Sequence, residues 1–311
     1  MYKFEGKEEG FSGMRLDKFL ADKFPQYSRS QFQKMIKNGD VLVNNGVLKS
    51  SYILAANDTV EVKDAFKKEV LIQSENIDLP IVYEDEEFLV INKPAGIIVH
   101  PDGASVSTGT VVNALFDKIP KGVGEDIRRG IVHRLDKDTS GLLVVVKTLE
   151  AKNYFVKQFQ GKTIKKVYLA LVKGILPHKE GRIEAPIGRD IRNRKKMAIV
   201  DENKGKNAIS LYKVLEEFEV SEKLRASLIE VEIKTGRTHQ IRVHMDSIGH
   251  PIVGDNVYGS APINRFFKEK FGLDRQFLHA KKLSFKHPKT GKTLSLEAEL
   301  PEDLEKVLKE V

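Results

Sequence analysis

Apolar residues near the start of the chain recur at helical spacing and are followed by short strand-like segments. Residues 16–24 place a large apolar side chain every three or four positions, and a proline then ends the run. Ser28 is a suitable N-cap for a second helix, which Gly39 would end. The segments 41–43 and 59–62 are rich in β-branched residues. This part of the chain therefore predicts two helices and a small β-element.

From residue 81 onward, strand-like and helical segments are intermixed. Short segments rich in β-branched residues predict strands at 88–91, 141–147, 167–172 and 227–233. Helices are predicted at 110–116, 150–160, 238–248 and 302–311. Runs of strands with few helices between them indicate an α+β fold with a mixed, mostly antiparallel central sheet, not a doubly wound one.

The pattern divides the chain into four parts. Residues 1–13 are expected to be an N-terminal extension, and residues 14–63 a small α/β domain. Residues 64–79 are polar, weakly patterned and followed by Pro80, so we expect a linker there. Residues 80–311 are long enough to form one large domain with a core of its own.

The charge balance favours a polyanionic partner. The chain of 311 residues has 52 Lys and Arg against 44 Asp and Glu, a net charge of +8. Such a charge attracts phosphates, although many basic proteins bind no nucleic acid. The absence of cysteine excludes disulfides, thiol nucleophiles and cysteine-ligated zinc. No segment approaches the ~20 apolar residues of a membrane span. Residues 1–10 do not resemble a secretory signal, so we expect a cytoplasmic protein.

Residues 14–63 resemble the S4 RNA-binding domain over nearly their whole length. The resemblance rests on the segments 15–20, 28–30 and 36–44. It implies that the second helix and the turn after it lie on an RNA backbone. The cations expected to contact phosphates are Arg15, Arg29, Lys34 and Lys37. The alternative is that these cations only form a solvated helix face.

The stretch 130–141 holds an unusual concentration of reactive side chains. Two carboxylates, Asp136 and Asp138, stand with two cations and a histidine directly before the apolar segment 142–146. A loop at the end of a buried strand presents a reactive group rigidly. From spacing alone, the two carboxylates are also compatible with a metal-binding pair or with a turn that has Asx hydrogen bonds.

This stretch resembles the signature of RluA-type pseudouridine synthases, in the residues His133 to Asp136 and Asp138 to Gly141. Other similar segments occur in the order of that family, at 92–101, 166–170, 235–244 and 277–288. Together with the S4 resemblance they cover almost the whole chain. The chain is therefore identified as a member of this family, and the resemblance implies the pseudouridine synthase fold for residues 80–311.

The resemblance assigns roles to individual residues. It implies that Asp136 is the nucleophile, that Tyr168 places its ring against the target base, and that Arg242 is the ion partner of Asp136. Leu278 would line the pocket beneath. Arg134 would contact a backbone phosphate or occupy the space that the flipped nucleotide leaves. The other residues of these segments expected to contact the substrate are His133, Arg237 and His239.

The implied reaction explains why these residue types are needed. Uridine becomes pseudouridine when the N1–C1′ bond breaks, the uracil rotates and a C5–C1′ bond forms. No redox step or group donor takes part, so we expect no cofactor and no metal. The carboxylate must be ionised, which burial opposes and a guanidinium favours. Extruding the base costs a few kcal/mol, and stacking on an aromatic ring returns ~1–3 kcal/mol.

Two points of this mechanism stay open at the level of sequence. Asp136 is suited to attack C1′, to add to C6 or to remove a ribose proton. The Tyr168 hydroxyl is a candidate for the proton transfer from C5.

A strongly basic loop, residues 188–196, lies between two predicted strands. Its cations are Arg189, Arg192, Arg194, Lys195 and Lys196. Most runs of charge are only solvated, but in an RNA-modifying enzyme this loop is a candidate clamp for the substrate.

Segments outside the active-site motifs indicate the substrate. Residues 253–259 and 274–276 are most similar to the RluD-like branch, which modifies large-subunit (23S) ribosomal RNA. Related members modify transfer RNA with the same catalytic motifs. The alternatives are an S4-domain ribosome-assembly factor without catalysis and an RNA glycosidase, for which a second placed acid is missing. We expect a monomer.

Overall fold

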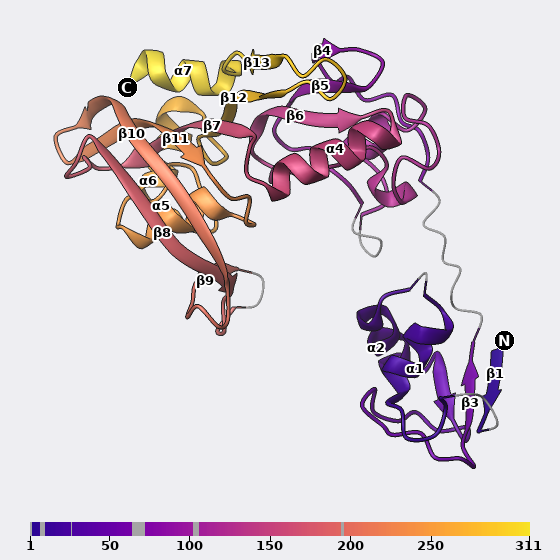
Figure 1. The fold of residues 1–311 in the computed structure, drawn as a ribbon. Helices are drawn as coiled ribbons and strands as arrows, with labels where there is room; N and C mark the ends of the chain where they lie inside the picture. Colours follow the sequence, from indigo (N-terminus) through magenta and orange to yellow (C-terminus); the bar gives the residue numbers. More distant parts are fainter. Residues whose placement is uncertain (1, 7–9, 26, 64–71, 102–105, 194–195) are drawn as a thin grey trace. The chain divides into compact units, whose positions relative to one another are not determined.

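The chain folds as two compact units, Met1–Leu71 and Ile72–Val311. The computed structural model describes residues 2–6, 10–25, 27–63, 72–101, 106–193 and 196–311 (Figure 1). Each unit has a hydrophobic core of its own. No helix in these described ranges is long and apolar enough to cross a membrane.

The N-terminal unit contains two helices and a three-stranded antiparallel sheet. Its elements are β1 (Tyr2–Glu5), α1 (Leu16–Lys23), α2 (Arg29–Lys37), β2 (Val41–Val43) and β3 (Thr59–Val62), and the sheet order is β1-β3-β2. Ser28 and Gln31 form a capping box, in which the side chain of each accepts from the backbone N–H of the other. Gly39, with a φ of +77°, follows the end of α2. The two helices predicted here are confirmed.

The first residues of the chain belong to the N-terminal unit, which corrects the extension expected at 1–13. β1 pairs with β3. Phe4 and Phe11 both meet the Phe19 ring edge to face, with ring centroids 5.5 and 5.0 Å apart. This non-local pairing was not visible as a local pattern, because the apolar residues concerned are scattered among charged ones.

The linker expected at 64–79 is shorter in the structure. Residues 64–71 lie outside the described residues, whereas residues 72–79 are part of the C-terminal unit. Ile72 and Leu79 are each only 7% exposed. The C-terminal unit therefore begins before residue 80, because these apolar side chains are buried in it.

A buried carboxylate holds two of the four cations predicted to meet RNA. Asp17 is fully buried, and Arg15 and Arg29 each donate to it at 3.1 Å. Burial alone would raise the pKa of Asp17, but these partners hold it well below its usual value. The two guanidinium groups remain partly exposed, and Lys34 and Lys37 are exposed on α2. RNA contact by these four cations stays a prediction.

The C-terminal unit is built on one sheet. Its strands are β4 (Ile81–Glu84), β5 (Phe88–Lys93), β6 (Ser140–Val146), β7 (Lys165–Lys173), β8 (Glu180–Arg189), β9 (Met197–Ile199), β10 (Lys206–Ser221), β11 (Leu224–Ile233), β12 (Leu278–Lys286) and β13 (Thr293–Glu297). They follow the order β4-β5-β6-β12-β7-β11-β10-β8-β9, with β13 paired to β12. Among the described strands, only β6 and β12 run parallel. The predicted mixed, mostly antiparallel sheet is confirmed.

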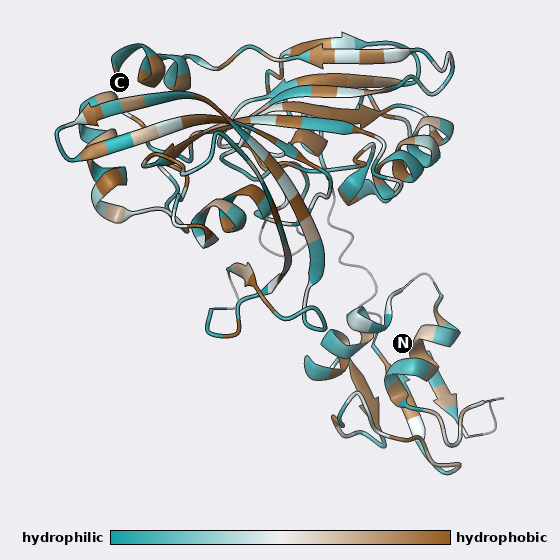
Figure 2. Ribbon diagram, turned by 60° about the vertical axis from the view of Figure 1, so that its left-hand side comes forward, coloured by the Kyte–Doolittle hydropathy of each residue, from teal (hydrophilic) through white to brown (hydrophobic). Residues whose placement is uncertain are grey.

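Helices pack on this sheet and complete its core. They are α3 (Val111–Ala114), a 3₁₀ turn (Asp126–Arg128), α4 (Leu149–Gln160), α5 (Gln240–Ser247), α6 (Ala261–Phe271) and α7 (Glu302–Glu310). α4 packs against β6, and α5 packs against β8, β9 and β10. The central strands β5, β6 and β7 are buried along nearly their whole lengths. Figure 2 shows apolar residues along the strands of the sheet and polar residues on the exposed sides of the helices.

The pattern of the sequence predicted the buried elements better than the solvated ones. The helices and strands predicted after residue 81 are present, with ends shifted by a few residues. The strands β4, β8, β9, β10, β12 and β13 and the helix α6 were not predicted. β10 is buried at fewer than half of its positions, and α6 buries only Phe267 and Phe271.

The parallel pair β6–β12 brings the loop around Asp136 next to the closing segment of the chain. Ser140 lies opposite His279, and Gly141 opposite Ala280. Gly141 has a φ of +114°, and a Cβ there would lie 2.4 Å from the Ala280 carbonyl oxygen. This position therefore requires glycine both for its backbone conformation and for the close approach of the two strands.

Gly141→Ala should lower the free energy of unfolding of the C-terminal unit by about 3 kcal/mol, because backbone strain and steric overlap add. Gly272→Ala is the matched control, since Gly272 has a φ of +78° but nothing lies within 4 Å of its Cβ position. Its loss should be only about 1 kcal/mol. Urea unfolding followed by circular dichroism measures both. Equal losses would show that the close approach of β6 to β12 is not the reason why position 141 requires glycine.

Candidate active site

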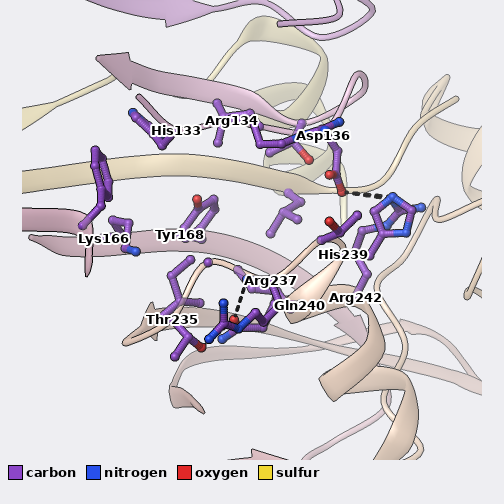
Figure 3. A pocket seen from close by; sticks show the side chains of 18 of the residues that line it. His133, Arg134, Asp136, Lys166, Tyr168, Thr235, Arg237, His239, Gln240 and Arg242 are labelled. Atoms are coloured by element: carbon purple, nitrogen blue, oxygen red, sulfur yellow. Dashed lines mark hydrogen bonds and ion pairs between the residues drawn. The ribbon is translucent and has the colours of Figure 1, made fainter. Parts of the chain in front are cut away.

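A cavity of about 490 Å³ opens in the C-terminal unit, bordered by β7, the loop before β6 and the segment that leads into α5 (Figure 3). Its volume lies in the range of small-ligand sites. Segments far apart in the sequence meet here. The cavity lining includes every residue that the sequence assigned to catalysis or to the target nucleotide: Asp136, Tyr168, Arg242, His133, Arg134, Arg237, His239 and Leu278.

An ion pair fixes one oxygen of the Asp136 carboxylate. Arg242 donates from Nη1 to Asp136 Oδ2 at 3.0 Å, so the contact that the family resemblance implied is present. The Asp136 side chain is 19% exposed. Its other oxygen, Oδ1, accepts no hydrogen bond from the described residues. One oxygen is therefore held in place while the other is left for a ligand.

The orientation of Arg242 depends on Asp255, which the sequence analysis did not assign to the site. Arg242 donates from Nε to Asp255 Oδ2 at 2.7 Å and from Nη2 to Oδ1 at 2.9 Å. Asp255 is fully buried. Burial alone would lower the pKa of Arg242, but the carboxylates of Asp255 and Asp136 raise it. Burial would likewise raise the pKa of Asp255, and Arg242 lowers it. Both groups of this pair are therefore charged.

A hydrogen-bonded chain connects the hairpin β8–β9 to His239. The Met197 backbone N–H donates to Tyr258 Oη at 2.8 Å, and this hydroxyl lies 2.8 Å from His239 Nδ1. Burial lowers the pKa of His239, so the imidazole is neutral at pH 7. Since Tyr258 Oη accepts from Met197, we assign its own hydrogen to Nδ1 and the imidazole hydrogen to Nε2. Nε2 lies 3.9 Å from Asp136 Oδ2.

His239 also has a left-handed backbone, with a φ of +56° at the start of α5. Such a conformation is strained for a residue with a side chain, and this kind of strain gathers at functional sites. The hydrogen bond to Tyr258 holds the imidazole beside Asp136.

Tyr168 and Leu278 supply apolar surface inside the cavity. They come from the neighbouring strands β7 and β12 and are 8% and 4% exposed. Burial raises the pKa of Tyr168 well above its usual value, and the negative charge of Asp136 adds to this effect. The phenol is therefore neutral. Figure 3 shows Tyr168 between the loop that carries Asp136 and the segment that carries His239.

His133 and Lys93 fix the loop that carries Asp136. His133 Nε2 accepts the Val144 backbone N–H at 2.9 Å, and burial lowers its pKa to about 3. Lys93 is fully buried and donates to three backbone carbonyls, one of them that of Lys137 at 3.0 Å. Burial lowers the pKa of Lys93 to about 7, whereas the three carbonyls favour its charged form. Sequence reasoning missed Lys93, because a lysine in a motif gives no sign of burial.

The Asp136–Asp138 pair does not have the surroundings of a metal site. Within the described ranges, no three His, Asp or Glu side chains are grouped as metal ligands. The Thr139 N–H donates to the Asp136 carbonyl oxygen at 3.2 Å, which forms a turn into β6. This bond joins backbone groups and involves neither carboxylate, so the Asx-turn alternative stays a prediction.

The cations of the basic loop are divided between several environments. Arg189 ends β8 and is exposed, as is Arg192. Lys196 donates from Nζ to the Val257 carbonyl at 2.6 Å, so it links the loop to the segment after Asp255. Arg194 and Lys195 lie outside the described residues. The clamp stays a prediction.

Asp255→Asn should lower the free energy of unfolding by about 3 kcal/mol, because it leaves the buried guanidinium of Arg242 beside a neutral partner. The matched control is Asp274→Asn, since Asp274 forms an exposed pair with Lys268 at 3.2 Å. This control should lose less than about 1 kcal/mol. Both values come from urea unfolding at neutral pH. A similar loss in both variants would mean that Asp255 does not support Arg242.

Comparison with known proteins places this geometry in a family. Residues 87–247 match the RNA pseudouridylate synthase family, and residues 14–60 match the S4 domain. The uncharacterized RNA pseudouridine synthase YlyB of Bacillus subtilis is 42% identical over 94% of this chain and 93% of its own. The ribosomal large subunit pseudouridine synthase D of Neisseria meningitidis serogroup A is 46% identical over 94% of this chain and 77% of its own.

A solved structure agrees with these matches. The structure of human RNA pseudouridylate synthase domain containing 1 superposes on this chain with a TM-score of 0.57 and 26% sequence identity. The match covers 73% of this chain and 86% of the human chain. From the family match, the relatives and this fold together, the chain belongs to the RNA pseudouridylate synthase family and carries an N-terminal S4 domain.

Proposed function

We propose that this protein converts specific uridines of large-subunit (23S) ribosomal RNA to pseudouridine, with Asp136 as the catalytic carboxylate. One observation carries the proposal: Asp136 has one oxygen held by Arg242 and the other left for a ligand, in a cavity that it shares with Tyr168. The choice of RNA rests on relatives named ribosomal large subunit pseudouridine synthase D, such as the one that is 46% identical.

In the proposed reaction, the target uridine leaves its stack and its uracil lies on the Tyr168 ring. Asp136 Oδ1 acts at C1′, at C6 or on a ribose proton, while Arg242 keeps Oδ2 oriented. The N1–C1′ bond breaks, the uracil rotates, and C5 bonds to C1′. C5 then loses its hydrogen as a proton, and N1 gains one. The atoms balance without a co-reactant, as an isomerisation requires.

Tyr168 serves this reaction as an aromatic platform. Stacking of a base on such a ring contributes ~1–3 kcal/mol. Its raised pKa argues against a phenolate that removes the C5 proton, because the neutral phenol would first have to lose its own. The hydroxyl remains suited to donate a hydrogen bond to the uracil.

Residues around Asp136 would hold the nucleotide. Arg134 is exposed at the cavity and suits a phosphate. His239 points Nε2 toward Asp136 and is suited to donate to a substrate oxygen. His133 accepts a backbone hydrogen bond from β6, so we propose that it positions the loop and that its substrate contact is limited to lining the cavity.

We further propose that the protein acts on RNA as a monomer in the cytoplasm. The S4 domain and the cations of the loop 188–196 would bind backbone phosphates, in keeping with the net charge of +8.

Asp136→Asn should abolish pseudouridine formation while folding and RNA binding persist, because the amide keeps the shape but cannot act as nucleophile or base. Unmodified 23S RNA is incubated with the wild type or the variant, treated with a carbodiimide and read by primer extension. Stops seen with the wild type alone would support the reaction, the residue and the RNA. Stops with the variant would remove Asp136 from the mechanism. Stops on transfer RNA only would contradict the ribosomal target.

Deleting residues 1–71 should leave the C-terminal unit folded, because its hydrophobic core is separate. The deletion should weaken RNA affinity roughly tenfold and flatten its salt dependence, since phosphate contacts are lost. Circular dichroism tests the fold, and fluorescence anisotropy with a labelled 23S stem-loop at several salt concentrations tests the affinity. An unchanged salt dependence would contradict RNA binding by the S4 domain.

A further inference from the structure

Lys166 is a buried cation that the proposed reaction leaves unused. It lies on β7 two positions before Tyr168, so both side chains point to the same face of the strand, about 6–7 Å apart along it. Its side chain is 9% exposed. Nζ lies 5.6 Å from the centre of the Phe159 ring, and a Cβ on Gly236 would be 3.9 Å from it. Lys166 therefore lines the same cavity as Tyr168 (Figure 3).

The described residues provide no negative charge to neutralise this ammonium group. Nζ has no hydrogen-bond acceptor and no carboxylate partner among them. Because these residues contain no fully buried side-chain nitrogen that lacks a partner, an unpartnered Nζ must open into the cavity. The charged group that acts on it is Arg237, a second cation. A buried cation beside a second, partly buried one costs free energy until an anion enters.

We propose that Lys166, together with Arg237, binds one backbone phosphate of the RNA, in a linkage adjacent to the target uridine. The inference rests on the proposed function, since it takes the target base to lie on Tyr168. It adds a second subsite to the cavity, separate from the Asp136–Arg242 pair. Lys166 binds the substrate there and takes no part in the bond changes at the sugar.

Charge and spacing both favour a phosphate over a carbonyl of the uracil. A phosphodiester has a full negative charge and two free oxygens, which match two cations, whereas a uracil carbonyl is neutral. Lys166 is displaced by two residues along β7 from the ring that holds the base. The Phe159 face attracts the ammonium group but supplies no anion. The group thus stays charged, aimed into the cavity and without a counter-ion.

The test combines a variant of the protein with a change in the RNA. Synthetic stem-loops, taken from the 23S site found by carbodiimide mapping, each contain one neutral methylphosphonate linkage near the target uridine. With the wild type, one linkage should lower kcat/KM by roughly tenfold to a hundredfold. Lys166→Met should lower kcat/KM for the all-phosphate RNA by a similar factor. This linkage should then cause only the smaller further loss that comes from the remaining Arg237 contact.

The salt dependence and a matched variant complete the experiment. Lys166→Met should reduce the slope of log(kcat/KM) against log[salt] by about 1, as expected for one lost phosphate contact. Lys166→Arg should retain most of the slope. Lys165→Met is the control, because Lys165 faces the other side of β7, is 57% exposed and pairs with Glu232 at 3.6 Å. It should leave the methylphosphonate effect unchanged.

Fully additive losses from Lys166→Met and every methylphosphonate would overturn the phosphate subsite. That result is distinct from a failure of the proposed function, in which the wild type would form no pseudouridine in any of these RNAs.

A stability measurement separates this effect from a folding defect. Burial, and then Arg237, lower the pKa of Lys166 from 10.5 to about 8. Between these two values Lys166 binds fewer protons in the folded state than in the unfolded state, so its contribution to wild-type stability should rise with pH. In free protein, Lys166→Met should therefore melt above the wild type below pH 8, and the difference should vanish above pH 10.5. A variant that melts below the wild type at pH 7 would show that the ammonium is already stabilised, which contradicts an unfilled anion subsite.

Discussion

Arg242 divides its hydrogen-bond donors between two carboxylates that come from segments far apart in the chain. Asp255 receives two of them in a bidentate pair, and Asp136 receives one. Any one of these charges would be costly to bury alone. Together the three groups have a net charge of −1, and the guanidinium between the two carboxylates is nearly inaccessible. The pair with Asp255 fixes the plane of the guanidinium, and this plane in turn sets the position of the Asp136 carboxylate.

The sheet makes this arrangement possible by placing loops from distant motifs at one cavity. The parallel contact of β6 with β12 is close enough to require a glycine at 141. On the other side of the same loop, Lys93 binds carbonyls of two separate turns. His133 is bonded to the backbone of β6. The position of Asp136 thus results from packing and hydrogen bonds that involve no substrate.

The sequence identified those site residues that lie within family motifs. The pairing of Asp136 with Arg242 followed from the family resemblance, and the structure contains it. Asp255 could not be found in this way, because its partner lies 13 residues away across a turn and no periodic pattern links the two. His133 was expected to contact the substrate. Its hydrogen bond depends on a backbone N–H of β6, and a sequence does not reveal which backbone groups are available.

The same limit applies to the fold. β6 is buried at every position, so its apolar run predicted it well, whereas β10 is half solvated and was missed. β1 was read as part of an extension because its partner β3 lies more than fifty residues further along the chain. Local sequence patterns indicate which segments are buried. Whether a partly exposed segment becomes a strand depends on its pairing with distant segments.

The Tyr258 hydroxyl group takes part in two hydrogen bonds. It accepts the Met197 backbone N–H at the start of β9, and it bonds to the imidazole of His239. The start of β9 is also the base of the basic loop. Movement of that loop away from Tyr258 would remove the Met197 donor, and the hydroxyl could then reverse its polarity toward Nδ1. The tautomer of His239, and with it the presence or absence of a donor facing Asp136, would then change. This single phenol therefore couples the position of the segment at Met197 to the proton on the imidazole beside Asp136.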